Sequence, residues 1–340
     1  MKSFASDNYS GAAPEIMQAI IEANCEHQPS YGNDSYTAQA QELLKATFGH
    51  QSESFFVYNG TAANSVALKA IVRSHHAILC SSTAHIATQE VGAVNNLTGC
   101  QTFIIPHENG KISAAAVQAA YNKATYWGHH GNLPKIVSVA QTTELGTVYS
   151  FDELRAISKV CRDNELIFHM DGCRLSNAAA FLNCSLVEVT RDVGVDVLSF
   201  GGTKNGLLFG EAIIFFKPEL AKEFAYIHKQ NLQLNSKMRF LSAQFIPYLR
   251  DKLWHRYAEH ANQMCQRLTT GLLELEGVKL AYPQQSNQVF VYLPEKIIQA
   301  TQNTYPFYLW DKEKKLARLV ASFDTTIDDV DTFVKLARTA

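Results

Sequence analysis

The sequence predicts an α/β fold in which helices cover both faces of a mostly parallel sheet. Two observations carry this prediction: short β-rich runs alternate with helical patterns, and several runs are apolar throughout, as strands buried between two helix layers are. The expected strands cover residues 54–58, 77–80, 102–105, 136–140, 166–170, 195–200 and 212–216. The helical patterns between them include residues 38–48, 61–73, 151–164 and 175–181.

The C-terminal part of the chain has a different pattern. It is almost wholly helical from Glu219 to about Leu275, and we expect one long helix from near Lys237 to Leu275 with a kink or break at Pro247. β-rich runs at 278–281, 288–293 and 318–322 and a closing helix at 327–337 follow. The chain has 340 residues, enough for about two domains. We therefore predict a large domain with an N-terminal arm over residues 1–250 and a small α+β domain over 251–340.

Composition argues against several classes of protein. Lys and Arg number 30 against 32 Asp and Glu, so no basic excess favours binding to nucleic acid. No apolar run approaches the roughly 18 residues of a membrane span, and the N-terminal residues lack the apolar core of a signal peptide. The seven cysteines are scattered without a CxxC pair, which is typical of free thiols in a reducing compartment. We expect a cytoplasmic protein without a bound metal, nucleic acid or membrane.

A possible phosphate site follows the first predicted strand. Asn59, Gly60 and Thr61 stand between that strand and a helical pattern, so unpaired backbone N–H groups and the helix dipole would meet there. Gly60 permits close approach, and Thr61 adds a hydroxyl. The simpler alternative is that Thr61 only caps the helix. The turn contains neither GxGxxG nor GxxxxGK[ST], so it gives no support to a dinucleotide or ATP site.

Two charged residues follow two other buried strands. Asp171 comes at the end of the run 166–170, and Lys204 follows the run 195–200 within a loop that also contains Gly201, Gly202 and Gly206. Open α/β sheets bind ligands at the carboxyl ends of their strands. A lysine, an aspartate and a phosphate-binding turn together suit pyridoxal phosphate: the lysine forms a Schiff base and the carboxylate keeps the ring nitrogen protonated. A surface lysine and a helix-capping aspartate are the alternative.

An ordered set of motifs over nearly the whole chain resembles the threonine aldolase and β-eliminating lyase family. The resemblance is greatest to its low-specificity L-threonine aldolases, in the branch that includes phenylserine aldolase. It implies the aspartate-aminotransferase-like fold, known as fold type I, and pyridoxal 5′-phosphate as cofactor. The motifs are residues 6–11, Pro14, residues 31–34, Thr37, residues 59–64, 84–85, Glu90, Gly92, residues 169–172, Arg174, Asn177, residues 199–201, 203–206, 236–239 and 318–320.

The resemblance also implies roles for individual residues. Lys204 would carry the cofactor, Asp171 would pair with its ring nitrogen, and His85 would stack on the ring. Further residues would hold the phosphate or the substrate carboxylate. Gly60, Thr61, Ala62 and Arg239 would serve the phosphate, Arg239 across a subunit interface of a homodimer or homotetramer, whereas Ser6, Arg174 and Arg318 would bind the carboxylate, for which the planar arginine fork is suited.

The implied reaction is retro-aldol cleavage of L-threonine or a related β-hydroxy-α-amino acid, such as phenylserine, to glycine and an aldehyde. Many members of the family have a histidine near the substrate hydroxyl, where this chain most simply has Glu144. Glu144 would act as base if burial raises its pKa; His85, or a water held by Glu90, is the alternative. β-Elimination from an aromatic or sulfur amino acid, and a cofactor-binding homologue of low activity, are the alternative functions.

Overall fold

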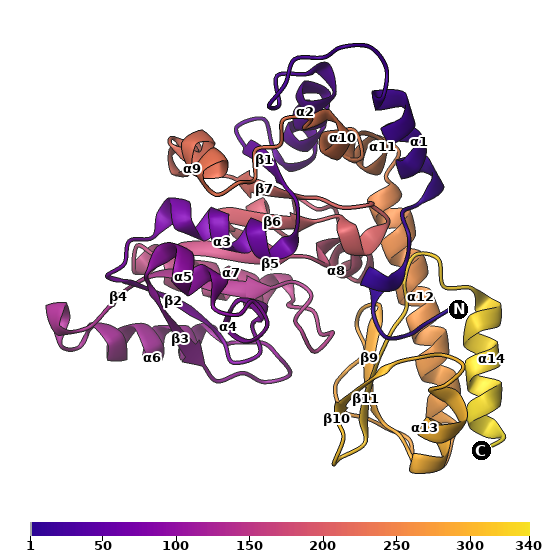
Figure 1. Ribbon diagram of the computed structural model, residues 1–340. Helices are drawn as coiled ribbons and strands as arrows, with labels where there is room; N and C mark the ends of the chain where they lie inside the picture. Colours follow the sequence, from indigo (N-terminus) through magenta and orange to yellow (C-terminus); the bar gives the residue numbers. More distant parts are fainter. Residues whose placement is uncertain (1) are drawn as a thin grey trace.

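The described chain consists of a large α/β body and a smaller sheet flanked by helices (Figure 1). A computed structural model describes residues 2–340. The strands are β1 (Glu53–Val57), β2 (His76–Ser81), β3 (Gln101–Ile105), β4 (Leu133–Ala140), β5 (Ile167–Gly172), β6 (Val197–Gly201), β7 (Glu211–Phe215), β8 (Lys279–Leu280), β9 (Gln288–Tyr292), β10 (Tyr308–Asp311) and β11 (Leu316–Val320). The α-helices are α1 (Pro14–Ala23), α2 (Ser35–Phe48), α3 (Gly60–Ile71), α4 (His85–Thr88), α5 (Ala93–Thr98), α6 (Ala114–Thr125), α7 (Phe151–Asp163), α8 (Leu175–Leu182), α9 (Phe224–Gln230), α10 (Arg239–Ser242), α11 (Phe245–Arg250), α12 (Leu253–Leu273), α13 (Glu295–Thr301) and α14 (Ile327–Arg338).

The larger sheet has seven strands in the order β1-β7-β6-β5-β4-β2-β3. All of its pairings are parallel except those of β7, which runs antiparallel to both β1 and β6. The predicted mostly parallel sheet is therefore confirmed. Because β1 and the central strands run in the same direction, their carboxyl ends meet at one edge of the sheet.

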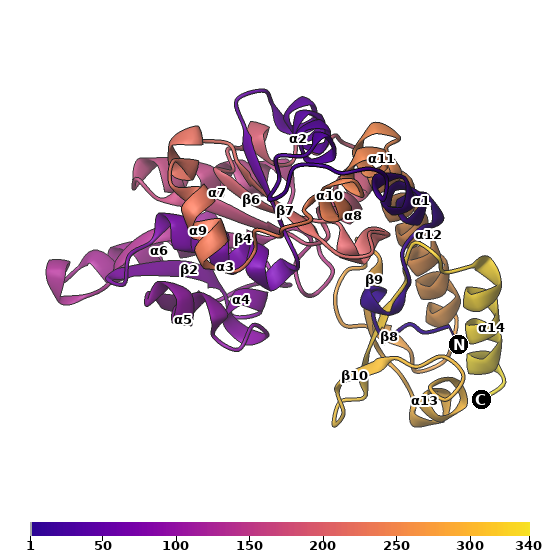
Figure 2. The same cartoon turned by 45° about the horizontal axis from the view of Figure 1, so that its top comes forward.

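Helices cover both faces of this sheet, so its strands contribute to two hydrophobic cores. Alternate residues of a strand point to opposite faces: in β6, Leu198 lies in the core formed with α2, α6, α7 and α8, whereas Val197 lies in the core formed with α3, α4, α5 and α9. This two-sided burial explains why the strands are apolar throughout. The figures show α1 and α2 close to α10 and α11, near the β1 side of the sheet (Figures 1 and 2).

Local capping agrees with several helix starts. Asp34 accepts the N–H of Thr37 at 2.7 Å at the start of α2, and Asn59 accepts the N–H of Ala62 at 2.9 Å at the start of α3. Ser150 begins α7 with a capping box that Glu153 completes. These side chains satisfy N–H groups that have no partner within their own helix.

The smaller sheet is antiparallel, with the order β10-β11-β9-β8, and α12, α13 and α14 pack on it. Phe4 joins this core from the other end of the chain, against Tyr305 and Phe333. The N-terminal segment thus tethers itself to the smaller sheet, where Figure 1 shows both termini. The domain boundary near residue 250 stays a prediction.

The predicted helix from Lys237 to Leu275 is wrong as a single element. The segment contains α10, α11 and α12, and Pro247 lies inside α11. The chain breaks at Lys252, whose φ of 51° is left-handed and cannot continue a right-handed helix. Among residues 2–340, no helix combines the length and apolar character needed to cross a bilayer.

Candidate active site

The sheet brings five of the predicted residues to its carboxyl edge. Gly60 begins α3 after β1, His85 begins α4 after β2, Glu144 follows β4, Asp171 lies near the end of β5, and Lys204 lies in a 3₁₀ turn after β6. This edge is where open α/β sheets bind their ligands. The topology alone therefore places a carboxylate, a lysine, a histidine and a helix N-terminus around one region.

Asp171 is buried and held in its ionised form. Its Oδ2 accepts a hydrogen bond from Asn64 Nδ2 at 2.9 Å, and its Oδ1 accepts the N–H of Cys173 at 3.0 Å. Burial by itself would raise the pKa of Asp171, but these hydrogen bonds and the positive charge of Lys204 lower the pKa below its usual range. Asp171 can therefore present a negative charge to a cationic partner inside the protein.

The turn that carries Lys204 is tightly packed, and a buried carboxyl group accepts a hydrogen bond from its backbone. A Cβ atom on Gly201 would lie 2.4 Å from the carbonyl oxygen of Cys173, so only glycine fits there. Glu211, the first residue of β7, accepts the N–H of Gly202 at 2.5 Å. Burial raises the pKa of Glu211 to about 7, against the opposing effects of this hydrogen bond and of Lys204. Sequence reasoning missed Glu211, because nothing in its local pattern distinguishes it from a strand-end charge.

His85 lies between two carboxyl groups from different segments. Its Nδ1 is 2.8 Å from Glu90 Oε1, and its backbone N–H donates to Glu144 Oε1 at 2.9 Å. The imidazole is about one-third exposed, whereas the Glu90 side chain is completely buried. One edge of the ring is thus fixed by the protein and the remainder is open to a ligand.

Glu144 has the electrostatic properties of a group that titrates near neutrality. Burial raises its pKa to about 7, and the charge of Asp171 acts in the same direction, while hydrogen bonds to backbone N–H groups oppose the shift. Its other oxygen, Oε2, is 3.4 Å from the Thr83 hydroxyl. The pKa of Glu144 is thus raised, which is the condition under which this residue would act as a base.

The start of α3 provides free backbone donors beside the end of β5. No hydrogen bond from the N–H of Gly60 or Thr61 is found within residues 2–340, whereas the N–H of Ala62 donates to the side chain of Asn59. A Cβ atom on Gly60 would lie 2.9 Å from Cys173 Sγ, so glycine lets the helix approach the strand. The predicted phosphate turn thus has two free donors, and its third is used by the helix cap.

Two guanidinium groups from opposite parts of the chain lie near Asp7. Arg174 binds Asp7 through Nε and Nη2 at 2.7 and 2.8 Å, and Asp7 also accepts from Asn287. Burial would raise the pKa of Asp7, but Arg174, with help from Lys204 and Arg318, lowers it to about 2. Burial and the charge of Arg174 lower the pKa of Arg318 to about 10. One carboxylate therefore faces three cationic side chains, and the excess positive charge favours an additional anion.

Two further predicted residues, Ser6 and Arg239, make their contacts outside the sheet edge. Ser6, which precedes Asp7, accepts the N–H of Asn8 at 3.2 Å as the cap of a 3₁₀ turn. Arg239 begins α10 and donates from Nη1 to the carbonyl of Glu26 at 3.1 Å. Arg239 is thus bonded to the segment after α1 in its own chain, and its Nε is buried without a partner among residues 2–340.

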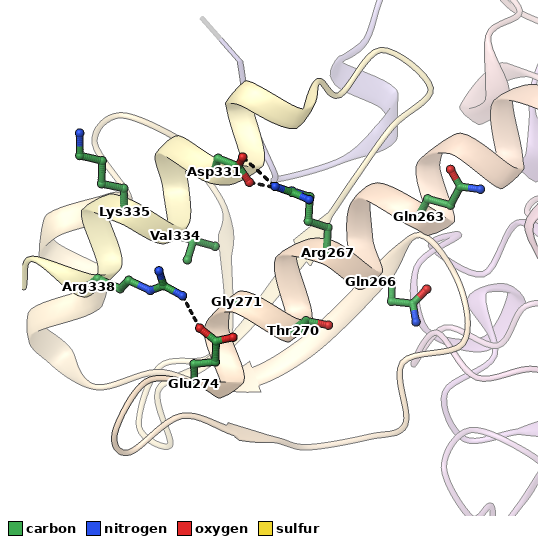
Figure 3. Close-up of a pocket in the computed structure, with 10 residues that line it drawn as sticks. All are labelled: Gln263, Gln266, Arg267, Thr270, Gly271, Glu274, Asp331, Val334, Lys335 and Arg338. Carbon is green, nitrogen blue, oxygen red and sulfur yellow. Dashed lines mark hydrogen bonds and ion pairs between the residues drawn. The ribbon is translucent and has the colours of Figure 1, made fainter.

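A pocket of about 780 Å³ lies elsewhere, in the groove between α12 and α14 (Figure 3). Two ion pairs cross it: Arg267 binds Asp331 at 2.7 and 2.8 Å, and Arg338 binds Glu274. None of the predicted site residues lines this pocket, and these pairs neutralise its charged lining residues except Lys335. We therefore place the candidate active site at the sheet edge and not in this groove.

The fold and the residues of the site together define the class of protein. A sheet of this topology, with a lysine after β6, an ionised aspartate at the end of β5 and a helix N-terminus after β1, is that of a pyridoxal-phosphate enzyme of fold type I. The beta-eliminating lyase family model matches residues 3–296, and the chain belongs to that family.

Individual relatives are similar over almost their whole length. Low-specificity L-threonine aldolase of Pseudomonas aeruginosa is 45% identical over 97% of this chain and 95% of its own. The enzyme of the same name from a Pseudomonas species is 43% identical over 95% and 93%. The solved structure of Leishmania major threonine aldolase has a TM-score of 0.95 and 29% identity, and it covers 100% of this chain and 99% of its own.

The residues present fit the cofactor that this family uses, pyridoxal 5′-phosphate. Asp171 is kept anionic in a buried position, which suits a protonated ring nitrogen. Gly60 and Thr61 supply unpaired backbone donors that suit a phosphate. The sheet edge therefore offers a partner for the ring nitrogen of the cofactor and donors for its phosphate.

Proposed function

We propose that this protein cleaves L-threonine and related β-hydroxy-α-amino acids, including phenylserine, to glycine and an aldehyde. The observation that carries the proposal is the meeting of Lys204, Asp171 and Gly60 at one sheet edge, in a chain 45% identical to a low-specificity L-threonine aldolase. When bound, pyridoxal phosphate supplies the electron sink for the Cα–Cβ bond that breaks.

The residues that would hold the cofactor follow from their positions. Lys204 would bind it covalently and Asp171 would pair with its ring nitrogen. His85 would lie on the ring face, since its imidazole is about one-third exposed at this edge of the sheet. Gly60 and Thr61 would bind the phosphate through backbone N–H groups; Ala62 would line the site without donating, since Asn59 takes its N–H.

Arg318 is best placed to bind the substrate carboxylate. Within residues 2–340 the only hydrogen bond of its side chain is from Nε to Gln288 at 3.1 Å, which leaves the terminal nitrogens free to donate. Arg174 already donates two hydrogen bonds to Asp7. It would therefore contribute to carboxylate binding mainly through its positive charge and its remaining terminal nitrogen. Ser6 lies beside this group and would add a hydroxyl. Two guanidiniums near a single carboxylate would be balanced by the incoming anion.

Glu144 is our candidate for the base that takes the proton from the substrate hydroxyl. Its pKa of about 7 lets it accept and return a proton at neutral pH. His85 is the competing base. Its backbone N–H donates to Glu144, so the two residues are neighbours in the site. A carboxyl group at this position replaces the histidine expected from other family members.

The active site is proposed to be completed by a second subunit, in a homodimer or homotetramer. Exposed apolar side chains support this: Ile21, Tyr31 and Leu232 are 63%, 46% and 85% exposed, and Glu26, the partner of Arg239, lies between the first two in the chain. Tyr31 is tied to this region through its N–H, which donates to the carbonyl of Ser236. Arg239 would then reach the phosphate of the neighbouring subunit.

A cytoplasmic location is part of the proposal. All seven cysteines, which lie within residues 2–340, are free thiols, as expected in a reducing compartment.

The second candidate function is β-elimination, which the family name favours. Rates with threonine and phenylserine, followed as aldehyde and glycine, should be compared with rates for an S-substituted cysteine, followed as ammonia and keto acid. We expect aldehyde and glycine in equal amounts, and no activity in Lys204→Ala. Faster release of ammonia would assign the protein to the lyases, and absence of both activities would leave it a cofactor-binding homologue.

A further inference from the structure

A buried hydrogen-bond chain joins His85 to Asp171 through the side chains of Glu90 and Asn64. Asn64, on α3, places its Nδ2 at 3.0 Å from Glu90 Oε1 and at 2.9 Å from Asp171 Oδ2. Glu90 Oε1 is also 2.8 Å from His85 Nδ1. Asn64, Glu90 and Asp171 are all buried. Three segments of the sheet edge are thus linked by a single continuous path.

The donors and acceptors along this path can be assigned from chemistry alone. An ionised carboxylate only accepts, and the amide nitrogen of asparagine only donates. Asn64 must therefore turn its amide nitrogen toward both carboxylates, which leaves its Oδ1 buried without a partner among the described residues. If Glu90 is likewise a carboxylate anion, the proton between His85 and Glu90 lies on Nδ1 of the imidazole.

We propose that Glu90 and Asn64 are positioning residues that fix His85 with a protonated Nδ1 and couple it to Asp171. The nitrogen of His85 left for the ligand side is then Nε2. Asn64 gives one hydrogen to each carboxylate, so a change at either end alters the hydrogen bond at the other. The buried Oε2 of Glu90 has no partner within residues 2–340, which leaves Oε1 as the atom through which Glu90 acts.

Other charged groups near His85 do not compete for Nδ1. Glu144, from the loop after β4, bonds to the backbone N–H of His85 and lies 3.4 Å from the Thr83 hydroxyl. Asp171, from β5, reaches the imidazole only through Asn64 and Glu90, and Lys204 follows β6. Within the described residues, Glu90 is the sole hydrogen-bond partner of the imidazole of His85.

The protonation pattern is a property of the chain and can be measured directly, while its effect on turnover rests on the proposed function. Nitrogen-15 NMR of the cofactor-loaded protein, labelled at histidine and assigned with His85→Gln, reports which ring nitrogen carries hydrogen. We expect a protonated Nδ1 in the natural protein and a smaller protonated fraction in Glu90→Gln, whose amide can donate to Nδ1. Glu108→Gln is the control, because Glu108 is exposed and makes no side-chain hydrogen bond in the described chain.

Asn64→Leu tests the coupling separately. It keeps the His85–Glu90 bond but removes a donor from Asp171, so Nδ1 should remain protonated while kcat falls by about 10-fold or more and KM changes by less than about twofold. An unprotonated Nδ1 in the natural protein would overturn the assignment, even in an active aldolase and even if the variants fail to fold. Unchanged kcat in folded Asn64→Leu would overturn the coupling.

Discussion

The pKa values of Asp171 and Glu144, two carboxyl groups at this sheet edge, shift in opposite directions because their immediate partners differ. Asp171 receives two hydrogen bonds and lies near Lys204, so its pKa falls despite burial. Glu144 is dominated by burial, and its pKa rises to about 7. The same residue chemistry thus yields a permanent anion beside a group that titrates at neutral pH.

Replacement of Asp171 by asparagine should abolish most turnover while leaving the fold intact. Asn keeps the shape and can still bond to Cys173, but it cannot supply the charge that stabilises a protonated ring nitrogen. We expect kcat to fall by roughly 100-fold or more, a size typical of losing a single electrostatic contact in an active site. Thermal unfolding checks stability; near-normal turnover would remove Asp171 from this role.

Glu144→Gln should change both the pH dependence of activity and that of stability. The pKa of Glu144 is about 7 in the folded chain against 4.5 for an ordinary glutamate. Between these values the unfolded chain loses its proton first, so the natural protein loses stability as pH rises from about 4.5 to 7. The variant lacks this loss of stability, which is at most about 3–4 kcal/mol at about 1.4 kcal/mol for each pKa unit.

Activity should show the opposite trend. A base must be ionised, so cleavage by the natural protein should increase as pH rises through about 7, and Glu144→Gln should have low activity without that limb. Denaturant titrations and kcat/KM at several pH values measure the two effects. A normal pH profile in Glu144→Gln would transfer the role of base to His85.

At the scale of elements, the site depends on the approach of α3 to the end of β5. Gly60→Ala would place its Cβ 2.9 Å from Cys173 Sγ, which forces the helix away from the strand. We expect weaker cofactor retention and a loss of about 1–3 kcal/mol of unfolding free energy. Equilibrium dialysis of cofactor and thermal unfolding measure these two effects.

Two variants isolate the cause. The double variant Gly60→Ala with Cys173→Ala removes the sulfur atom and should recover much of the loss. Gly11→Ala is the matched control, since a Cβ there meets no atom within 4 Å. If the double variant retains cofactor no better than Gly60→Ala alone, the contact with Cys173 is not what positions the helix.

Helices and strands could be predicted where the local sequence pattern determines them, and not where it does not. The strands of the large sheet were found because burial on both faces leaves a continuous apolar signal, and α2, α3, α7 and α8 were found between them, whereas α1, α4, α5 and α6 were not predicted. The break at Lys252 was missed because apolar residues flank it: Leu249 precedes it and Leu253 follows, so the pattern resembles one helix. The half-exposed edge strand β10 gave no such signal either.

The site was predictable in its strand-end residues and not in its long-range partners. Asp171 and Lys204 follow apolar runs, which sequence reveals. The pairing of Arg174 with Asp7 joins positions 167 apart, and Glu211 meets the Lys204 turn only because β7 reverses beside β6. Such contacts arise from tertiary packing and leave no mark in local composition.

At the scale of the whole molecule, the proposed shared site makes a mixing experiment informative. Arg239→Ala should weaken cofactor binding about 10- to 100-fold, because a charge-assisted hydrogen bond contributes roughly 1.5–3 kcal/mol. Mixing it with inactive Lys204→Ala should restore some activity after subunit exchange, since one site of a mixed dimer has both residues intact. Mixed dimers without activity would contradict donation between subunits.

The fate of the Cα–Cβ bond distinguishes retro-aldol cleavage from the other reactions that the cofactor supports. L-Threonine labelled with carbon-13 at Cβ should be incubated with the cofactor-loaded protein and followed by carbon NMR, with Lys204→Ala as the control. Retro-aldol cleavage predicts that all label appears in acetaldehyde and its hydrate, with unlabelled glycine in equal amount. Label retained in a four-carbon keto acid, with release of ammonia, would contradict the proposed function.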